Sequence, residues 1–244
     1  MAAGVPCQDA YAYRIEKDGT WAAAVADGAG SARYAAAASE IAVKTAVGYL
    51  SLCLALNKPD TPDRCRRILS ECVAHVRLCL KERSSARNKD SPTETSLNDF
   101  ATTLLVVFMS DSFFGAAQIG DGAIVYRDGS GGLTVACKPE QGEYLNETFF
   151  ITSEDFDRHC QLAIADSRVV DAVSMFSDGL QMLALNYKDF SAHGPFFNPL
   201  FQYAGRQAAD PEELRQLLVS ERICEHSDDD KTIVLAVRST CSQR

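Results

Sequence analysis

The sequence is short of positive charge, and it lacks any segment typical of a membrane anchor or a secretion signal. Its 244 residues include 24 lysines and arginines against 33 aspartates and glutamates, which gives a net charge of −9 at pH 7. Because lysines and arginines do not cluster along the sequence, we do not expect the protein to bind nucleic-acid phosphates. No apolar run approaches the roughly 20 residues that cross a membrane, and residues 1–6 lack the basic start and apolar centre of a signal peptide. These absences predict a soluble, cytoplasmic protein.

Internal repeats and low-complexity tracts are absent as well. Hydrophobic residues make up 46% of the chain, which is enough to bury a core as one large domain or at most two small ones. The polar stretch over 81–98 is too short to separate two domains. We therefore predict a single domain over residues 1–240 and a short tail at 241–244.

The nine cysteines do not form an obvious disulfide framework. An odd number without a secretory signal indicates reduced thiols. Cys65, Cys72 and Cys79 repeat every seven residues, as the core positions of a helix do. An alternative is a zinc site in which Cys72, His75 and Cys79 share one helix face, but no fourth ligand is obvious. Core packing is the favoured interpretation.

Hydrophobic periodicity and turn residues predict two strands, two helices and then a run of short strands. A capping hydroxyl and a proline at Thr61–Pro62–Asp63 start the second helix. The predicted elements are, in chain order, strands over 7–15 and 21–26, helices over 33–56 and 61–83, an exposed loop over 81–98, strands over 100–109, 113–119, 123–127 and 133–137, further β structure over 161–176, a short helix from 180 to 185, a helix over 210–222 and a strand over 233–237.

This order indicates an α+β fold rather than alternating βαβ units. The short strands after residue 100 predict an antiparallel meander, and two groups of strands with helices outside them predict a β-sandwich covered by helices. Residues 138–160 lack periodicity and are predicted to form a loop or flap. Residues 186–205 are rich in aromatic side chains, which form either a docking patch or, more commonly, packing beneath a long loop.

Aspartates follow or precede four of the predicted strands. They lie at Asp27–Gly28, in the turn at Gly120–Asp121–Gly122, at Asp178–Gly179 and in the run Asp228–Asp230. A single Asp-Gly pair usually does no more than make a turn. Carboxylates gathered from four strand ends would make an oxygen-rich site, which suits Mg²⁺ or Mn²⁺ rather than zinc. The four together favour a metal site.

Six short motifs, spread over nearly the whole chain, occur in an order that resembles the PPM family, the type 2C metal-dependent Ser/Thr protein phosphatases, and in particular its compact bacterial branch. The motifs are Cys7-Gln8-Asp9-Ala10, Ala26-Asp27-Gly28-Ala29-Gly30-Ser31, Ala101-Thr102-Thr103-Leu104, Ile119-Gly120-Asp121, Phe176-Ser177-Asp178-Gly179 and Asp229-Asp230-Lys231-Thr232. The resemblance implies two stacked antiparallel β-sheets flanked by helices, with a two-metal centre at one end of the sandwich.

The resemblance also implies a role for each motif aspartate. Asp27 would bridge both metals, Asp178 and Asp229 would complete the first site, and the carbonyl of Gly28 would bind the second metal. Asp9 would hold a metal-bound water from the outer shell.

Asp121, together with Asp178, matches the third-metal site of bacterial relatives. The two cations of the main centre would activate a bridging water and neutralise the charge of the phosphoryl oxygens. This water would attack phosphorus in line, without a covalent phospho-enzyme. The implied activity is hydrolysis of phosphoserine and phosphothreonine in proteins that a cognate Ser/Thr kinase has phosphorylated. No cysteine begins a convincing Cys-x5-Arg loop of the kind used by cysteine phosphatases.

Two features depart from the family pattern. Some relatives carry an arginine upstream of the first motif that holds the substrate phosphate, but only residues 1–6 precede Cys7 here. Arg33 is the candidate substitute, although a surface arginine is more often a solvated charge. Eukaryotic members place a histidine directly after Asp-Gly as a proton donor, whereas this chain has Ala29. None of its histidines is an evident replacement from sequence: His75, His159, His193 and His226.

Two other functions stay open at this point. One is a non-catalytic member of the same fold that binds phosphopeptides or serves as a regulatory scaffold. Loss of metal carboxylates would mark such a protein, and here Asp27, Asp121, Asp178 and Asp229 are all present. The other is a phosphatase of small metabolites, since no motif displays substrate preference.

Overall fold

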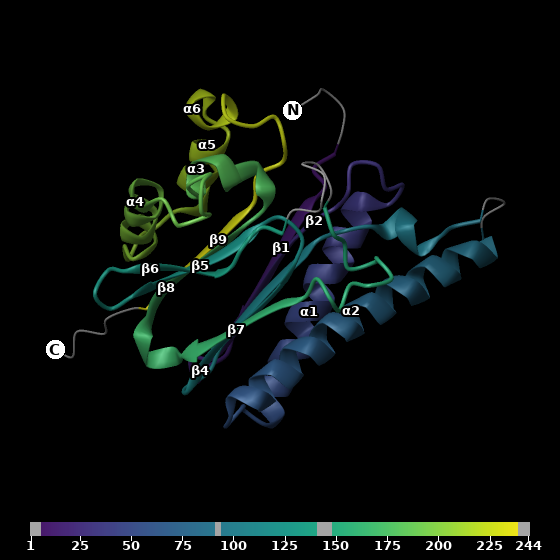
Figure 1. Ribbon diagram of the computed structural model, residues 1–244, viewed down its shortest axis with the longest axis horizontal. Coiled ribbons are helices and arrows are strands. Elements are labelled where there is room, and N and C mark those ends of the chain that lie inside the picture. The colour runs from purple at the N-terminus through teal and green to yellow at the C-terminus, as the bar shows by residue number, and fades with distance from the viewer. Residues whose placement is uncertain (1–5, 91–93, 141–147, 239–244) are drawn as a thin grey trace.

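The computed structural model describes residues 6–90, 94–140 and 148–238. Two antiparallel β-sheets are stacked face to face, as predicted (Figure 1). The first sheet has the strand order β1-β2-β3-β4-β7, and the second has the order β6-β5-β8-β9. The strands are β1 (Asp9–Ile15), β2 (Trp21–Asp27), β3 (Leu104–Met109), β4 (Phe113–Ile119), β5 (Ala123–Asp128), β6 (Leu133–Cys137), β7 (Gln161–Asp166), β8 (Val170–Phe176) and β9 (Ile233–Val237).

Helices cover the outer face of each sheet. Two long helices lie against the first sheet and four short ones lie against the second (Figure 1). The α-helices are α1 (Ala35–Leu56), α2 (Pro62–Asp90), α3 (Gln181–Ala184), α4 (Gly194–Ala204), α5 (Pro211–Leu218) and α6 (Glu221–Cys224). The part of the chain that the structure describes also contains the short 3-10 helices η1 (Leu97–Phe100), η2 (Ser167–Val169) and η3 (Asp178–Leu180).

The strand β2 shows why its sequence is apolar at every position. Ala22, Ala24 and Ala26 pack toward α1 and α2, while Ala23 and Val25 pack between the two sheets. A strand buried on both faces reads as a continuous apolar run. The small alanine side chains also allow the alanine-rich face of α1 to approach the sheet closely.

Helix α1 corrects the prediction that no apolar run approaches membrane-spanning length. This helix has 22 residues and a mean hydropathy of 1.4, so by length and composition alone it could cross a membrane. Its buried side chains, such as Ala38, Ala42 and Leu50, belong to the core cluster that α1 forms with β2 and α2. Those contacts are the arrangement of a core helix rather than of a membrane span.

The predicted loop over 81–98 is wrong in its first half, because α2 continues to Asp90. Two polar residues in the C-terminal part of α2 contact residues from other segments. The Ser84 hydroxyl donates to the Thr95 carbonyl at 3.2 Å, and the Arg87 guanidinium lies 4.3 Å from the centre of the Tyr34 ring. The 3-10 helix η1 then follows, so β3 begins at Leu104 rather than at residue 100.

The predicted meander is divided between the two sheets. Strands β3 and β4 pair in the first sheet, whereas β5 and β6 pair in the second. Gly120, with φ of +114°, sits in the link between the two pairs, a backbone conformation that favours glycine. The segment 161–176 is likewise two strands, β7 and β8, which lie in different sheets. Hydrophobic alternation could not reveal which sheet a strand joins.

The aromatic segment 186–205 contains helix α4, which the sequence did not predict. Phe197 and Phe201, one helical turn apart, are buried against the second sheet, so packing rather than docking explains them. The helix predicted over 210–222 is two helices, α5 and α6. Residues 148–160 of the predicted flap form turns, while 141–147 and the predicted tail at 241–244 lie outside the described residues.

Two glycines offer a matched test of this packing. A Cβ at Gly115 of β4 would lie 2.3 Å from the ring of Phe108, its partner across the strand pair, whereas a Cβ at Gly48 of α1 would meet nothing within 4 Å. We expect Gly115→Ala to lower the free energy of unfolding by about 1–3 kcal/mol through overpacking. Gly48→Ala should raise it by about 0.5–1 kcal/mol. Urea titration of both variants measures these changes, and equal midpoints would contradict the packing.

Candidate metal centre

Asp27 is the last residue of β2, and Asp9, the first residue of β1, lies directly opposite it. The backbone of Asp27 is fixed by the Ala101–Thr103 motif. Its N–H donates to the Thr103 hydroxyl at 2.9 Å, and its carbonyl accepts from the Thr103 N–H and the Thr102 hydroxyl, both at 2.8 Å. Both threonines are buried. These contacts leave the carboxylate of Asp27 free for other partners.

Gly28 continues the chain where no side chain would fit. A Cβ at this position would lie 2.4 Å from the carbonyl oxygen of Ala35, at the start of α1. The Gly28 N–H donates to the Gln8 carbonyl at 3.1 Å, so the strand ends of β1 and β2 stay together. The Asp27–Gly28 pair is therefore a close approach between strand end and helix rather than a simple turn.

Asp121 reaches the same place from the link between the two sheets, and Asp178 reaches it from the second sheet. Asp121 lies in the link from β4 to β5, and Asp178 opens η3 directly after β8. A Cβ at Gly179 would lie 2.1 Å from the carbonyl oxygen of Asp230, so this second Asp-Gly pair is also a close backbone approach.

The carboxylates of Asp27, Asp121 and Asp178 converge. One oxygen from each lies within 4.8 Å of the others, and this is the only such group of potential metal ligands among the residues that the structure describes. Burial, with a further contribution from neighbouring carboxylates, raises the pKa of Asp27 to about 10 and that of Asp178 to about 7. Burial also raises the pKa of Asp121. Three acidic groups held this close cannot all be ionised without compensating positive charge.

The oxygens that a cation would bind lack other partners. The Oδ1 atoms of Asp9, Asp121 and Asp178 are buried and accept no hydrogen bond. Buried polar atoms of a folded protein almost always have a partner, so unpaired ones indicate a place for an ion or a water. All are hard oxygen donors, which suit Mg²⁺ or Mn²⁺. The residues present therefore fit the metal that the sequence predicted.

Asp9 and Asp229 lie at the margin of the group. The Asp9 Oδ2 accepts from the Ser177 hydroxyl at 2.7 Å, and its carboxyl is in hydrogen-bond contact with that of Asp27. Asp229 is exposed and its Oδ1 accepts from the Asp230 N–H at 2.9 Å. Its charge contributes to the raised pKa of both Asp27 and Asp178, but its oxygens do not belong to the 4.8 Å group.

Arg33, the predicted phosphate anchor, lies on the surface beyond the Asp27 loop. Its guanidinium is 5.2 Å from the centre of the Tyr34 ring, which Arg87 of α2 also approaches. Among the histidines, His159 binds Glu140 through Nδ1 at 2.9 Å. The structure thus brings three predicted carboxylates together and sets Arg33 against an aromatic ring.

The alternative zinc site on α2 is wrong. Cys72 is fully buried and its thiol donates to the carbonyl of Ala46 at 3.7 Å, while Cys79 lies 3.9 Å from the His75 Nε2. Burial raises the pKa of the Cys72 thiol, so it stays protonated. The eight described cysteines are all free, as predicted: Cys7, Cys53, Cys65, Cys72, Cys79, Cys137, Cys160 and Cys224.

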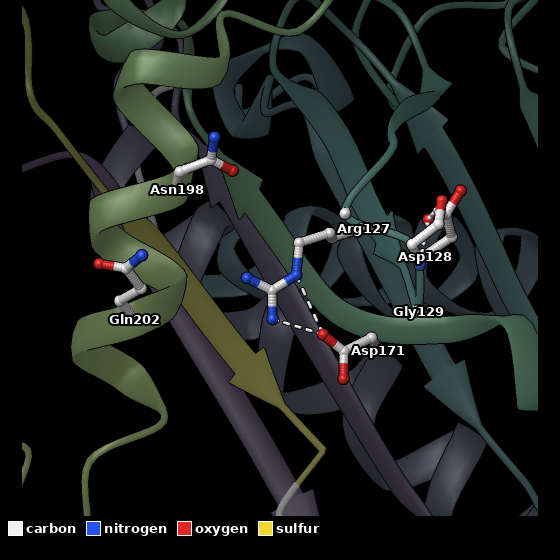
Figure 2. A pocket seen from close by; sticks show the side chains of 8 residues that line it. Arg127, Asp128, Gly129, Asp171, Asn198 and Gln202 are labelled. Carbon is white, nitrogen blue, oxygen red and sulfur yellow. Dashed lines mark hydrogen bonds and ion pairs between the residues drawn. The ribbon is translucent and has the colours of Figure 1, made fainter.

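A hollow lies at the other end of β5, about 20 Å from Asp121 at roughly 3.3 Å per strand residue. It has a volume of about 430 Å³, and Figure 2 shows Arg127 directed at Asp171 below the amide side chains of Asn198 and Gln202. The Arg127 Nε donates to Asp171 at 3.0 Å, and the guanidinium lies 5.1 Å from the Phe201 ring. Arg127 therefore ties β5 to β8 and α4.

Sequence reasoning missed several residues that support the carboxylates. Thr102 and Thr103 were visible only as part of a matching motif, although they fix the backbone of Asp27. Ser177 orients Asp9 across the two sheets. Thr148, whose hydroxyl donates to Asp121 at 2.6 Å, had no signal in the sequence, because it lies in a stretch without periodicity.

Comparison with known proteins agrees with this geometry. The sequence profile of a family described as Protein phosphatase 2C matches residues 1–219. The chain is 35% identical to Serine/threonine-protein phosphatase 3 of Escherichia coli (strain K12) over 246 aligned residues, which cover 97% of this chain and 93% of the relative.

Solved structures share the fold at low sequence identity. The serine/threonine phosphatase Stp1 from Staphylococcus aureus aligns with a TM-score of 0.63 at 14% identity, covering 96% of this chain and 90% of that one. The catalytic domain of the serine threonine protein phosphatase PstP, in complex with two manganese ions, aligns with a TM-score of 0.55 at 17% identity, covering 93% and 96%. From the family match and the full-length relative together, this chain belongs to the protein phosphatase 2C family.

Proposed function

We propose that this protein is a metal-dependent serine/threonine protein phosphatase that hydrolyses phosphomonoesters. The observation that carries the proposal is the convergence of Asp27, Asp121 and Asp178 in a chain of the protein phosphatase 2C family. Asp121 and Asp178 each contribute a buried oxygen that has no hydrogen-bond partner. The curated relative from Escherichia coli is named as a serine/threonine phosphatase, which supports this substrate class. A non-catalytic scaffold would have no use for such a group of mutually repelling carboxylates.

The cofactor that we propose is Mg²⁺ or Mn²⁺, in two sites with a third at Asp121 and Asp178. Asp27, Asp178, Asp229 and the carbonyl of Gly28 would hold the first two cations, with Asp9 in the outer shell. When bound, such cations lower the pKa of a water and offset the negative charge of the phosphoryl group. Manganese in the solved structure of PstP supports the choice of metal.

The chain's own residues hold this site in place. Thr102 and Thr103 fix the backbone of Asp27, so its carboxylate is positioned without being tied up by a hydrogen bond from the threonines. Ser177 fixes one oxygen of Asp9, and the other, Oδ1, is buried without a partner and would accept a hydrogen bond from a water. Positioned groups of this kind supply most of the catalysis in phosphoryl transfer.

Seven of the eight described cysteines have a raised pKa, which disfavours a thiol nucleophile at these positions. Burial raises the pKa of Cys137 to about 12 and that of Cys65 and Cys160 to about 11. Loss of hydration raises the pKa of Cys7 to about 11. A thiol is reactive as its thiolate, which these values disfavour at neutral pH.

The partners that we propose are phosphorylated proteins together with the Ser/Thr kinase that modifies them, and the proposed location is the cytoplasm. The relative's name supports a phosphoprotein substrate. The net charge of −9 disfavours nucleic acid as a partner. We also keep Arg33 as the proposed anchor of the substrate phosphate.

Phosphatase activity should depend on added metal. We expect hydrolysis of a phosphothreonine peptide in the presence of Mn²⁺ and its loss after treatment with a chelator, because every proposed ligand is an oxygen that releases these cations reversibly. Re-addition of Mn²⁺ should restore the rate, which distinguishes metal removal from unfolding. Full activity after exhaustive chelation would contradict the proposal, and activity on small phosphate esters alone would point to a metabolite phosphatase.

Metal-free protein should lose stability as the pH rises. The pKa of Asp178 is raised to about 7 and that of Asp27 to about 10, whereas unfolded aspartate has a pKa of about 3.9. The folded protein therefore binds protons more tightly, so this contribution to stability is full below about pH 4 and is lost as the pH rises through the folded pKa values.

Thermal unfolding across this range, with chelator and with saturating Mn²⁺, tests the expectation. The midpoint temperature of the metal-free protein should fall as the pH rises, and Mn²⁺ should flatten that dependence because it stabilises the ionised carboxylates. Since all other groups titrate in both samples, the difference between the two curves reports the metal centre. Parallel curves would argue that no cation binds there.

Asp27→Asn should reduce kcat by about a hundredfold or more, the scale seen when one electrostatic group is removed from an active site. Its backbone contacts with Thr102 and Thr103 do not use the side chain, so the variant should fold. Isothermal titration of Mn²⁺ should show weakened binding at both sites. The matched control is Asp228→Asn, which changes an exposed aspartate of the acidic run before β9. Two unchanged tight sites in Asp27→Asn would rule out a bridging role.

A further inference from the structure

The Asp121 carboxylate is held by a residue 27 positions later in the chain. The hydroxyl of Thr148 donates to Asp121 Oδ2 at 2.6 Å. The other oxygen of the same carboxylate, Oδ1, is buried and has no partner. One oxygen is thus fixed by the protein while the other is left for a ligand.

We propose that Thr148 is a positioning residue for Asp121, and that Arg77 of α2 is the remote anchor of the segment that carries Thr148. The proposal rests on the metal-dependent function proposed above and assigns these two residues to its third cation site, at Asp121 and Asp178. Thr148 does not touch substrate or the reacting atoms in this assignment. Its role is to fix the rotation of one carboxylate.

Fixing that rotation matters because an aspartate carboxylate turns easily about its last bond. A hydrogen bond to one oxygen selects the orientation in which the other oxygen faces the cation. Such an outer partner also offsets part of the negative charge that Asp121 places within 4.8 Å of an Asp178 oxygen. In metal sites, loss of one outer partner typically weakens metal affinity or activity by about 10- to 100-fold.

Thr148 is itself placed by its neighbours in the chain. The ring of Phe149 stacks on His159 with centroids 3.5 Å apart and an angle of 10° between the rings. The N–H of Ile151 donates to the carbonyl of Thr102 at 3.0 Å. Thr102 also fixes the backbone of Asp27. Residues 148–151 therefore contact Asp121 directly, through Thr148, and are linked to Asp27 through Thr102.

Arg77 then fastens this segment to the long helix. Its Nη1 donates to the carbonyls of Ile151 at 2.7 Å and Ser153 at 2.6 Å, and its guanidinium lies 4.6 Å from the centre of the Phe156 ring. In Figure 1 the segment after residue 148 runs alongside α2, far in sequence from the helix that holds it. Two charge-assisted hydrogen bonds from one guanidinium make this a strong contact.

The first test compares Thr148→Val, which removes the hydroxyl at nearly constant shape, with Thr148→Ser, which keeps it. Isothermal titration of Mn²⁺ into purified protein should show about 10-fold or greater weakening of one site, the third, in Thr148→Val. Thr148→Ser should bind like wild type. Thermal unfolding with chelator should give similar midpoints for both variants, which excludes misfolding as the cause. Wild-type Mn²⁺ binding by Thr148→Val would overturn the positioning role.

The second test uses Arg77→Met. The matched control is Arg66→Met on the same helix, because Arg66 forms its described ion pair with Asp63, one helical turn away, at 2.9 Å. Arg77→Met should weaken the same Mn²⁺ site, and Arg66→Met should not. If Arg77 acts through Thr148, the double variant Arg77→Met/Thr148→Val should be no weaker than the worse single variant. Additive losses, or wild-type binding by Arg77→Met, would overturn the anchoring role.

These outcomes are separate from those of the proposed function. A wild-type protein that binds Mn²⁺ but hydrolyses no phosphopeptide would contradict the phosphatase assignment, while the Mn²⁺ titrations would still decide the role of Thr148. Conversely, Thr148→Val with wild-type Mn²⁺ affinity would overturn the positioning role in a protein that remains an active phosphatase.

Discussion

Mutual repulsion among partly buried carboxylates is the constraint on which the rest of this structure depends. Asp27, Asp121 and Asp178 each place an oxygen within 4.8 Å of the others, and the resulting loss of hydration and like-charge contact raise their pKa values. The chain compensates through the backbone. Thr102 and Thr103 hold the Asp27 peptide units from both sides, so the strand end keeps its position whether or not the carboxylate has a partner. The fold therefore tolerates an unfavourable charge arrangement that a cation would relieve.

Glycine in the Asp-Gly motifs serves this arrangement in a way that the sequence did not suggest. A single Asp-Gly pair usually makes a turn, yet Gly28 and Gly179 do not adopt positive φ. A Cβ at Gly28 would overlap the start of α1, and a Cβ at Gly179 would overlap the backbone of Asp230. Both positions need the absence of a side chain for close backbone approach. In each motif the aspartate is therefore followed by a glycine that lets a neighbouring segment pack closely beside it, the start of α1 at Gly28 and Asp230 at Gly179.

The sequence predicted the parts of this protein that depend on local pattern. Strand ends with aspartate, the paired sheets and the reduced cysteines followed from short-range spacing and from the family resemblance. The extension of α2, the helix α4 and the division of the meander between two sheets depend on partners far away in the chain, such as Thr95 for Ser84. Thr148 illustrates the limit best, because its partner Asp121 lies 27 residues earlier and nothing in the intervening sequence predicts the contact. Asp229 shows the converse, since the motif names it but the structure leaves it outside the close group.

The aspartates of the site come from both sheets, so the packing between the sheets affects the geometry of the site. Asp27 ends a strand of the first sheet, Asp178 follows a strand of the second, and Asp121 lies on the link that crosses from one to the other. Stacked sheets keep a spacing of about 10 Å that is set by the side chains between them. Those side chains include Val25 and Met175, which lie on the two strands that carry Asp27 and Asp178. Because a close-packed interior transmits small changes in volume, the layer between the sheets sets the distance between the carboxylates, and the core residues of β2 and β8 belong to the site as much as the aspartates at their ends.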